Sequence, residues 1–314
     1  MTRAAAALVL SACWTASVAP VHQAPAIDVR PVQEVVVADA ASAYAMVIDA
    51  TSLYWVGGEG VEEGIWRADK RAGARPVRLA KTVDARGLTQ DGDRLWWGDG
   101  TAVRWVKKAG GEVTTALSAL PVTVYDMTRD RGDIVVMSED AATDRIRITR
   151  YAVSDGSEGA TVELLGSSPI TFAQDEGLYV GTSSQFVRVR RDGTVDVVFE
   201  GDGDVQTMFF AKEMILFASG GRVYRASKAG GRGREIAKTP GMVTDVGVDD
   251  RYIYWGSSLE SPGGAIYRMP RGGGTPRVFV RLDGEPSSVI VDGDYLYWAD
   301  TLQGTIMRRR RTAP

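Results

Sequence analysis

The sequence predicts an all-β chain built from one repeated unit, and three observations carry this prediction. The stretch Ser288–Arg311 has the order strand, Asp-Gly-Asp turn, aromatic strand, polar loop and third strand. The stretches Val246–Arg271 and Met46–Lys70 repeat that order. The first apolar residue of each second strand, here called the reference residue, recurs about every forty residues. The reference residues are Leu53, Leu95, Ile134, Leu178, Ile215, Ile253 and Leu296.

A repeat of about forty residues with several short strands per unit is typical of a β-propeller blade. The seven reference residues therefore predict a seven-bladed β-propeller. Rings of six or eight blades are the alternatives, because the middle repeats have degenerated. One closed ring accounts for the whole repeat region, which we place at residues 31–314 as a single domain.

Each unit contains the signals of four strands. A tight turn rich in acid and glycine, such as Asp91–Asp93, closes the first hairpin of most units. A third strand with basic residues and a glycine-rich turn to a fourth strand follow. The last unit stops after its third strand, whereas Val32–Ala38 has no partner of its own. We therefore expect Val32–Ala38 to pair beside Gly304–Arg310 and complete the seventh blade, which would leave no open seam.

Composition excludes several classes of protein and of modification. The net charge of −3 gives no electrostatic case for nucleic-acid binding, although Arg308–Arg311 form a basic run. The chain has one cysteine, so it forms no intramolecular disulfide. It has no asparagine, which excludes N-glycosylation. Its hydrophobic share of 44% is ample for a buried core.

The N-terminus has the features of an export signal. Arg3 precedes the apolar run Ala4–Leu10, which is too short to cross a bilayer but long enough for a signal peptide. The run ends in Leu10-Ser11-Ala12-Cys13, which resembles the bacterial lipobox. That resemblance implies cleavage after residue 12 and lipidation of Cys13, with residues 13–30 as a tether that contains His22. The alternative is an ordinary secretory signal cut further on, with Cys13 discarded.

Lipidation would place the chain in the bacterial cell envelope. Acyl chains on Cys13 would hold the protein at a membrane surface. The residue after Cys13 is Trp14, not the Asp that marks inner-membrane retention in lipoproteins of this class. We therefore expect a periplasmic or outer-membrane location. Separately, we expect the ring to be a monomer.

The repeat resembles a known propeller superfamily. Tyr297-Trp298-Ala299-Asp300, followed by Ile306 and Arg308, resembles the YWTD repeat, and the wider NHL and gluconolactonase-like propellers are similar. Tyr254-Trp255 and Tyr54-Trp55 match in part. YWTD rings have six blades, whereas seven units are counted here. In that family the motif is structural, so the resemblance implies a fold and no chemistry.

Acidic residues collect in the loops that face one side of the predicted ring. Such loops could bind a basic protein partner or Ca²⁺, which prefers six to eight oxygen ligands, or they could be ordinary solvated acids. The candidate ligand-binding residues are Glu59, Glu62, Glu63, Asp99, Glu139, Asp140, Asp144, Glu260 and Asp300. Asp202 and Asp204 resemble part of a calcium loop and are the candidate metal ligands, with an ordinary turn as the alternative.

Missing residue types restrict catalysis. With His22 in the tether, the ring can form neither a Ser-His-Asp triad nor a histidine-ligated metal site. Lipidation would remove Cys13 as a nucleophile. We therefore expect a rigid scaffold that binds a protein or a ligand, without a cofactor except for the Ca²⁺ option. The alternative is a lactonase-like, metal-dependent hydrolase that works with carboxylates.

Overall fold

A computed structural model describes residues 33–40, 42–58, 63–140, 143, 145–165, 171–174, 177–182, 185–200, 205–211, 214–228, 233–258 and 263–312, without the side chains of 140, 171–174, 200 and 206. These residues belong to one compact unit, Val32–Pro314. The part of the chain before it, including Cys13 and His22, lies outside the described residues. Among the residues described there is no helix that is long and apolar enough to cross a membrane.

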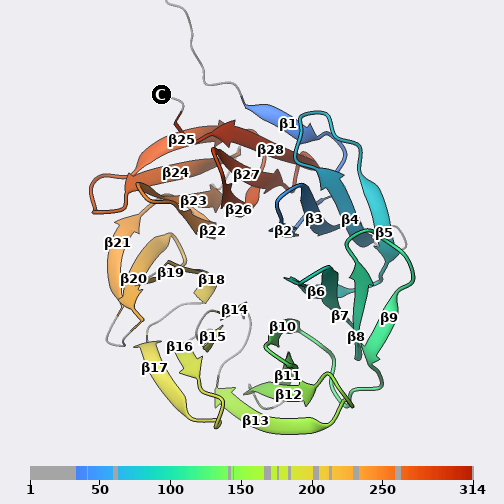
Figure 1. The fold of residues 1–314 in the computed structure, drawn as a ribbon. Coiled ribbons are helices and arrows are strands. Elements are labelled where there is room, and N and C mark those ends of the chain that lie inside the picture. Colours follow the sequence, from blue (N-terminus) through green and yellow to red (C-terminus); the bar gives the residue numbers. More distant parts are fainter. Residues whose placement is uncertain are drawn as a thin grey trace, which may run out of the picture. The chain divides into compact units, whose positions relative to one another are not determined.

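Seven four-stranded antiparallel sheets stand around a central opening, which confirms the predicted seven-bladed β-propeller (Figure 1). Blade 1 consists of β2 (Ala45–Ile48), β3 (Ser52–Gly57), β4 (Gly64–Asp69) and β5 (Val77–Lys81). Blade 2 consists of β6 (Ala85–Asp91), β7 (Arg94–Asp99), β8 (Ala102–Lys107) and β9 (Thr114–Leu117). Blade 3 consists of β10 (Asp126–Asp130), β11 (Asp133–Asp140), β12 (Arg145–Ala152) and β13 (Glu158–Leu165).

The remaining blades follow the same order. Blade 4 consists of β14 (Thr171–Gln174), β15 (Leu178–Gly181), β16 (Gln185–Val189) and β17 (Val195–Glu200). Blade 5 consists of β18 (Val205–Phe210), β19 (Met214–Ser219), β20 (Arg222–Ser227) and β21 (Arg234–Lys238). Blade 6 consists of β22 (Met242–Val248), β23 (Tyr252–Ser258), β24 (Gly264–Pro270) and β25 (Arg277–Leu282). Blade 7 consists of β26 (Pro286–Asp292), β27 (Tyr295–Asp300), β28 (Thr305–Arg310) and β1 (Glu34–Val37).

The strand β1 closes the ring, as the sequence predicts. It pairs antiparallel with β28, with Glu34 opposite Arg308. The guanidinium of Arg308 donates to the Glu34 carboxylate across this pair, with Nη2 2.6 Å from Oε2. The other edge of β1 accepts hydrogen bonds from Gly73 and Ala74, in the β4–β5 turn of blade 1. The closing strand is therefore bonded to blade 7 on one side and to blade 1 on the other.

The core of the ring is divided among the blade interfaces. Seven clusters of buried apolar side chains combine residues of neighbouring sheets, so each sheet buries both faces against its neighbours. All seven reference residues are buried; Leu53 at 0% and Leu178 at 1% exposure span their range. Trp55, Trp97, Trp255 and Trp298 are also fully buried, as expected for packing residues between blades. First strands contact one another from blade to blade and surround the central opening.

Truncation of the closing strand tests whether it contributes to the core. Val36 is fully buried, whereas its neighbour Val35 is 40% exposed. We expect Val36→Ala to lower the free energy of unfolding by about 2 kcal/mol, because it leaves a cavity between blades. Val35→Ala is the matched control and should cost less than about 0.5 kcal/mol. Urea unfolding of the two variants measures the difference, and equal effects would show that β1 is not part of the cooperative ring.

Candidate functional site

Glu63 is buried and joins two blades. It is 9% exposed. Its Oε1 accepts a hydrogen bond from the backbone N–H of Ala85 at 2.7 Å and another from the Tyr44 hydroxyl at 3.2 Å. Burial and the Glu63 carboxylate together raise the pKa of Tyr44, so this hydroxyl stays a donor. Both acceptor contacts of Glu63 are thus made within the protein.

Among the other described acids of the predicted binding face, Asp99 and Asp300 contact residues of their own hairpins. Asp99 forms an ion pair with Arg104 of its own hairpin at 3.2 Å. Asp300 is 4% exposed and accepts a hydrogen bond from the backbone of Gln303 at 3.0 Å, which caps the β27–β28 turn. Glu139 is half-buried in β11. The structure does not bring these carboxylates together into one site.

The remaining predicted residues belong to the part of the chain that the structure does not describe. Outside the described residues lie Glu59, Glu62, Asp144, Glu260, Asp202 and Asp204, together with the side chain of Asp140. Among the residues described, no group of three or more His, Cys, Asp or Glu lies close enough to hold a metal ion. The calcium site at Asp202 and Asp204 stays a prediction.

A repeated polar contact between blades is centred on an aspartate four residues before the reference residue. In blade 1 this residue is Asp49, which accepts hydrogen bonds from the backbone of Thr51 and Ser52 and from the Tyr54 hydroxyl. Lys108 of blade 2 lies 3.3 Å from the same carboxylate. Burial acts to raise the pKa of Asp49, but the hydrogen bonds outweigh it and lower the pKa to about 2.

A second contact runs in the opposite direction across the same interface. Arg67 in β4 donates to the main-chain oxygen of Lys108 at 3.3 Å. The pattern returns between blades 6 and 7 with Asp249, Arg311 and Arg268, and between blades 7 and 1 with Asp292, Lys70 and Arg308. We call this set of three residues the inter-blade clamp. It consists of the aspartate four residues before the reference residue, an arginine in the third strand of the same blade, and the basic residue that directly follows the third strand of the next blade. Because its members recur at fixed positions of the repeat, an alignment of the units could have found it.

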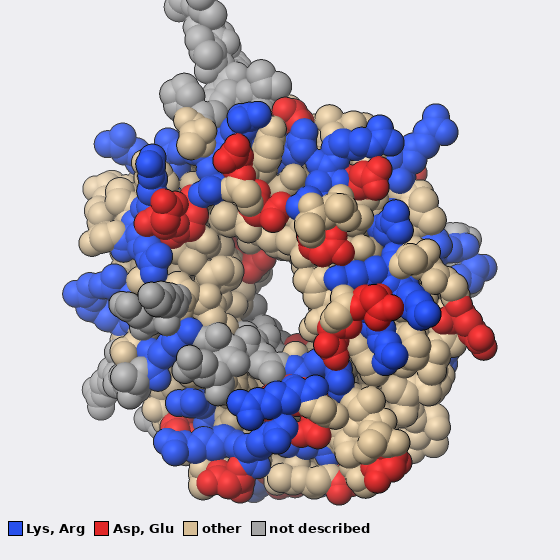
Figure 2. Space-filling view, in the orientation of Figure 1, with Lys and Arg blue, Asp and Glu red and all other residues tan. Residues whose placement is uncertain are grey.

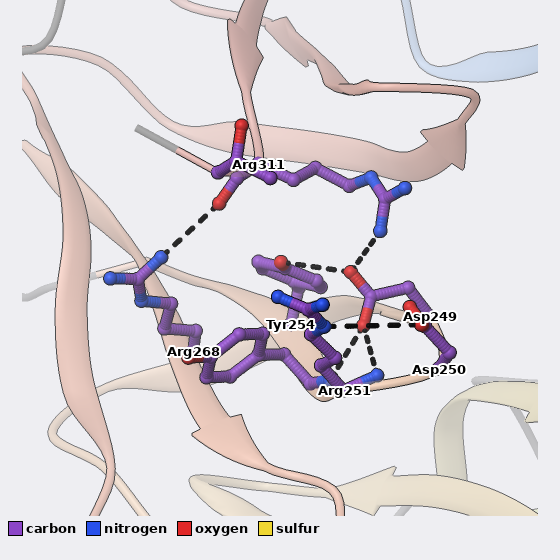
Figure 3. Close-up of a pocket in the computed structure, with 8 residues that line it drawn as sticks. Asp249, Asp250, Arg251, Tyr254, Arg268 and Arg311 are labelled. Atoms are coloured by element: carbon purple, nitrogen blue, oxygen red, sulfur yellow. Dashed lines mark hydrogen bonds and ion pairs between the residues drawn. The ribbon is translucent and has the colours of Figure 1, made fainter. Parts of the chain in front are cut away.

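The clamp between blades 6 and 7 borders a cavity of about 340 Å³. Figure 3 shows Arg311 reaching Asp249 from one side and Arg268 bonded to the main-chain oxygen of Arg311. The Arg268 guanidinium lies over the rings of Tyr252, at 5.0 Å, and Phe279, at 4.8 Å. These contacts hold Arg268 in one orientation on the wall of the cavity.

Charged side chains at the rim of this cavity are left exposed. Arg251 and Asp250 are 4.0 Å apart, with side chains 76% and 80% exposed. Inside, Asp249 accepts from the backbone of Arg251 and Tyr252 and from the Tyr254 hydroxyl. Burial opposes these bonds, but they dominate and lower the pKa of Asp249, so its carboxylate holds no proton to donate. The described lining of the cavity therefore combines charged and aromatic side chains that are held in place by contacts within the protein.

A half-buried aspartate on the inner ring was not among the predicted residues. Asp245 in β22 accepts a hydrogen bond from the Thr207 hydroxyl of blade 5 at 2.8 Å and one from the backbone of Val246 at 2.8 Å. The backbone of Val289 in blade 7 also donates to it. Burial is the dominant cause that raises the pKa of Asp245 to about 6.

The same repeat position carries an aspartate in blade 3. Asp126 and Asp245 both lie eight residues before their reference residues, a shared position that the sequence could have revealed. Gly87 in β6 permits the approach of Asp126, because a Cβ at Gly87 would lie 2.2 Å from Asp126 Oδ1. Gly87 also has a φ of 63°, in the region that favours glycine. These residues fix the packing of first strands around the opening.

Comparison with known proteins identifies the fold. A chain of the mitotic checkpoint complex shares 12% identity at a TM-score of 0.65, over 96% of this chain and 98% of that one. The RRP9 WD40 repeats share 13% identity at a TM-score of 0.63, over 88% and 97%. BamB from Moraxella catarrhalis shares 16% identity at a TM-score of 0.55, over 86% and 83%. The likeness is one of fold. No family and no curated protein matches the sequence.

The raised pKa of Asp245 predicts a pH-dependent stability. The folded pKa of about 6 lies above the ordinary 3.8, so the folded state binds more protons between about pH 4 and pH 6. Stability should fall as pH rises through that window and stay lower above it. We expect Asp245→Asn, which is uncharged but of the same shape, to be about 2–3 kcal/mol more stable than wild type at pH 7.5 and about equal at pH 3.5.

Urea unfolding at the two pH values makes this measurement. Asp69→Asn is the control, because the Asp69 side chain is 52% exposed in a surface pair with Arg71. A variant at Asp245 that is less stable than wild type at pH 7.5 would contradict the expectation, since it would mean that the charged carboxylate is favourable in place.

Proposed function

We propose that this chain is a binding scaffold of the bacterial cell envelope. It recognises a protein partner at the cavity lined by Asp249–Tyr252, Tyr254, Arg268, Arg311 and Thr312, which we call the groove between blades 6 and 7. The observation that carries the proposal is the combination of exposed Arg251 and Asp250 with Tyr252 and Arg268 around one cavity. Arginine and tyrosine are enriched in the residues that dominate the free energy of protein association. A guanidinium held over aromatic rings loses little further freedom when it binds.

The clamps support this proposal through rigidity. They tie blade 6 to blade 7, blade 7 to blade 1 and blade 1 to blade 2 by paired side-chain contacts. A surface that is already ordered spends less free energy on association than one that must first be ordered. Figure 2 shows that Lys and Arg side chains gather over most blades on one face of the ring, with Asp and Glu side chains between them. Such mixed charge favours a partner with a complementary pattern.

Similar structures include propellers from protein assemblies. The chain from the mitotic checkpoint complex is one of them, and its likeness to this chain extends over most of both chains. This supports the scaffold proposal by analogy of fold. No observation on the described residues favours the hydrolase alternative.

The envelope part of the proposal rests on the sequence alone. Leu10-Ser11-Ala12-Cys13 supplies the lipobox-like site, and the only cysteine of the chain occupies the position that would be lipidated. A lipid on Cys13 would hold the scaffold at a membrane surface, on the periplasmic side or at the outer membrane.

Loss of the partner from charge-altered variants tests the binding groove. Chemical crosslinking in cells that express the full chain, followed by purification, should yield a crosslinked partner with wild type. We expect Arg251→Glu to lower the yield of that partner about tenfold or more, because it reverses the exposed charge of the groove. Arg222→Glu is the control, since Arg222 forms an exposed pair with Glu235 in blade 5. Equal loss in both variants, or no loss in either, would contradict a site between blades 6 and 7.

Substitution of the cysteine tests the anchor independently. We expect wild-type chain to sediment with membranes and to incorporate a labelled fatty acid. Cys13→Ser should abolish the label and move the chain to the soluble fraction, because the acceptor thiol is lost. Trp14→Ala keeps the thiol and serves as the control. Membrane sedimentation that is unchanged in Cys13→Ser would overturn the lipid anchor and leave the groove proposal untouched.

A further inference from the structure

The groove between blades 3 and 4 is the repeat counterpart of the groove in Figure 3. Asp130 occupies the position of Asp249, four residues before its reference residue. Arg150 stands opposite the residue after that reference residue, as Arg268 does in blade 6. A cavity of about 150 Å³ lies here, bordered by both blades. The same architecture therefore forms a second pocket at another interface.

The charge of the two pockets differs. The described lining of the blade 3–4 pocket contains five arginines and one aspartate: Arg131, Arg150, Arg188, Arg190, Arg191 and Asp130. The blade 6–7 pocket contains three arginines and two aspartates. Asp175 and Glu176, which precede Gly177 in the chain, lie outside the described residues. Among the residues that are described, the blade 3–4 pocket is strongly basic.

Three of these arginines have acidic partners. Arg150, with a side chain 9% exposed, lies 2.5 Å from Asp130. Arg191 lies 3.0 Å from Asp133, and Arg190 lies 2.7 Å from Asp196. These pairs fix the wall of the pocket and balance three of its positive charges.

The other two arginines have no such balance within the described part of the chain. The Arg188 guanidinium lies over the Tyr179 ring at 5.7 Å, and its buried Nε has no hydrogen-bond partner among the described residues. A Cβ at Gly177 would lie 2.9 Å from that Nε, so glycine leaves it room. The side chain of Arg131 likewise has no ion pair with a described residue. Its φ of 59° is a strained value for a non-glycine residue.

We propose that the blade 3–4 pocket binds a phosphate group. Two unbalanced guanidinium groups beside a buried ion pair match an oxyanion that carries close to two negative charges, as phosphate does near neutral pH. A carboxylate would leave one of them without a counter-charge. The planar guanidinium also offers parallel N–H donors to two oxygens of one phosphate. The small volume suits a single group, which reaches the pocket as free inorganic phosphate or as a phosphomonoester on a larger molecule.

This site is separate from the groove between blades 6 and 7, so the two proposals succeed or fail independently. Titration calorimetry of the chain with inorganic phosphate, O-phosphoserine and acetate tests the phosphate pocket. We expect the phosphate compounds to bind and acetate to bind at least about tenfold more weakly. Tighter binding of O-phosphoserine than of inorganic phosphate would assign the pocket to phosphomonoesters, and the reverse order to free phosphate. Equal binding of acetate, or no heat from either phosphate compound, would overturn the proposal.

Variants locate the binding. Arg131→Gln is the primary variant, since its exposed side chain can change without loss of core packing. We expect it and Arg188→Gln to weaken phosphate binding about tenfold each. Arg222→Gln is the control, because Arg222 forms an exposed pair with Glu235 in blade 5, outside both pockets, and it should bind phosphate as wild type does. Unchanged phosphate affinity in Arg131→Gln, with Tm equal to wild type, would place the binding elsewhere and overturn the assignment.

Discussion

Packing between blades is the interaction on which the rest of this structure depends. No single sheet has a core of its own, because every apolar cluster is shared by two neighbours. Trp55 and Trp298 are fully buried only because another blade covers them. Every blade therefore needs both neighbours, and the chain needs a closed ring. Closure depends in turn on β1, which supplies the fourth strand that blade 7 lacks.

Most of the fold could be predicted from the sequence, because the repeat determines it. Leu53, Leu296 and their equivalents mark second strands that must be buried. The unpaired strand near the N-terminus can pair only with the last blade, which lacks a fourth strand. The site could be predicted less well. Glu63 precedes β4 and Asp300 ends β27, but sequence position does not tell whether a carboxylate faces solvent or a backbone N–H. That outcome depends on the neighbouring blade.

Repeat positions carry more information than residue types do. Composition alone points to the acids of the loops, whereas the contacts between blades involve aspartates at a fixed distance from the reference residue. Asp49 and Asp249 accept the same set of hydrogen bonds in different blades. In blades 4 and 5 this position holds Gln174 and Ala211. Blade 4 keeps its strand arginine, Arg188, and the buried Nε of this side chain has no hydrogen-bond partner among the described residues.

The two-sided bonding of β1 has a mechanical consequence. A pull on the chain before residue 33 would enter the ring at Glu34, the first residue of that strand. If β1 were bonded to β28 alone, the load would peel one strand from one sheet, a hydrogen bond at a time. The bonds from Gly73 and Ala74 pass part of the load to blade 1. Hydrogen bonds on both sides of β1 thus hold the ring together where it closes, which is the place where tension would otherwise separate blade 7 from blade 1.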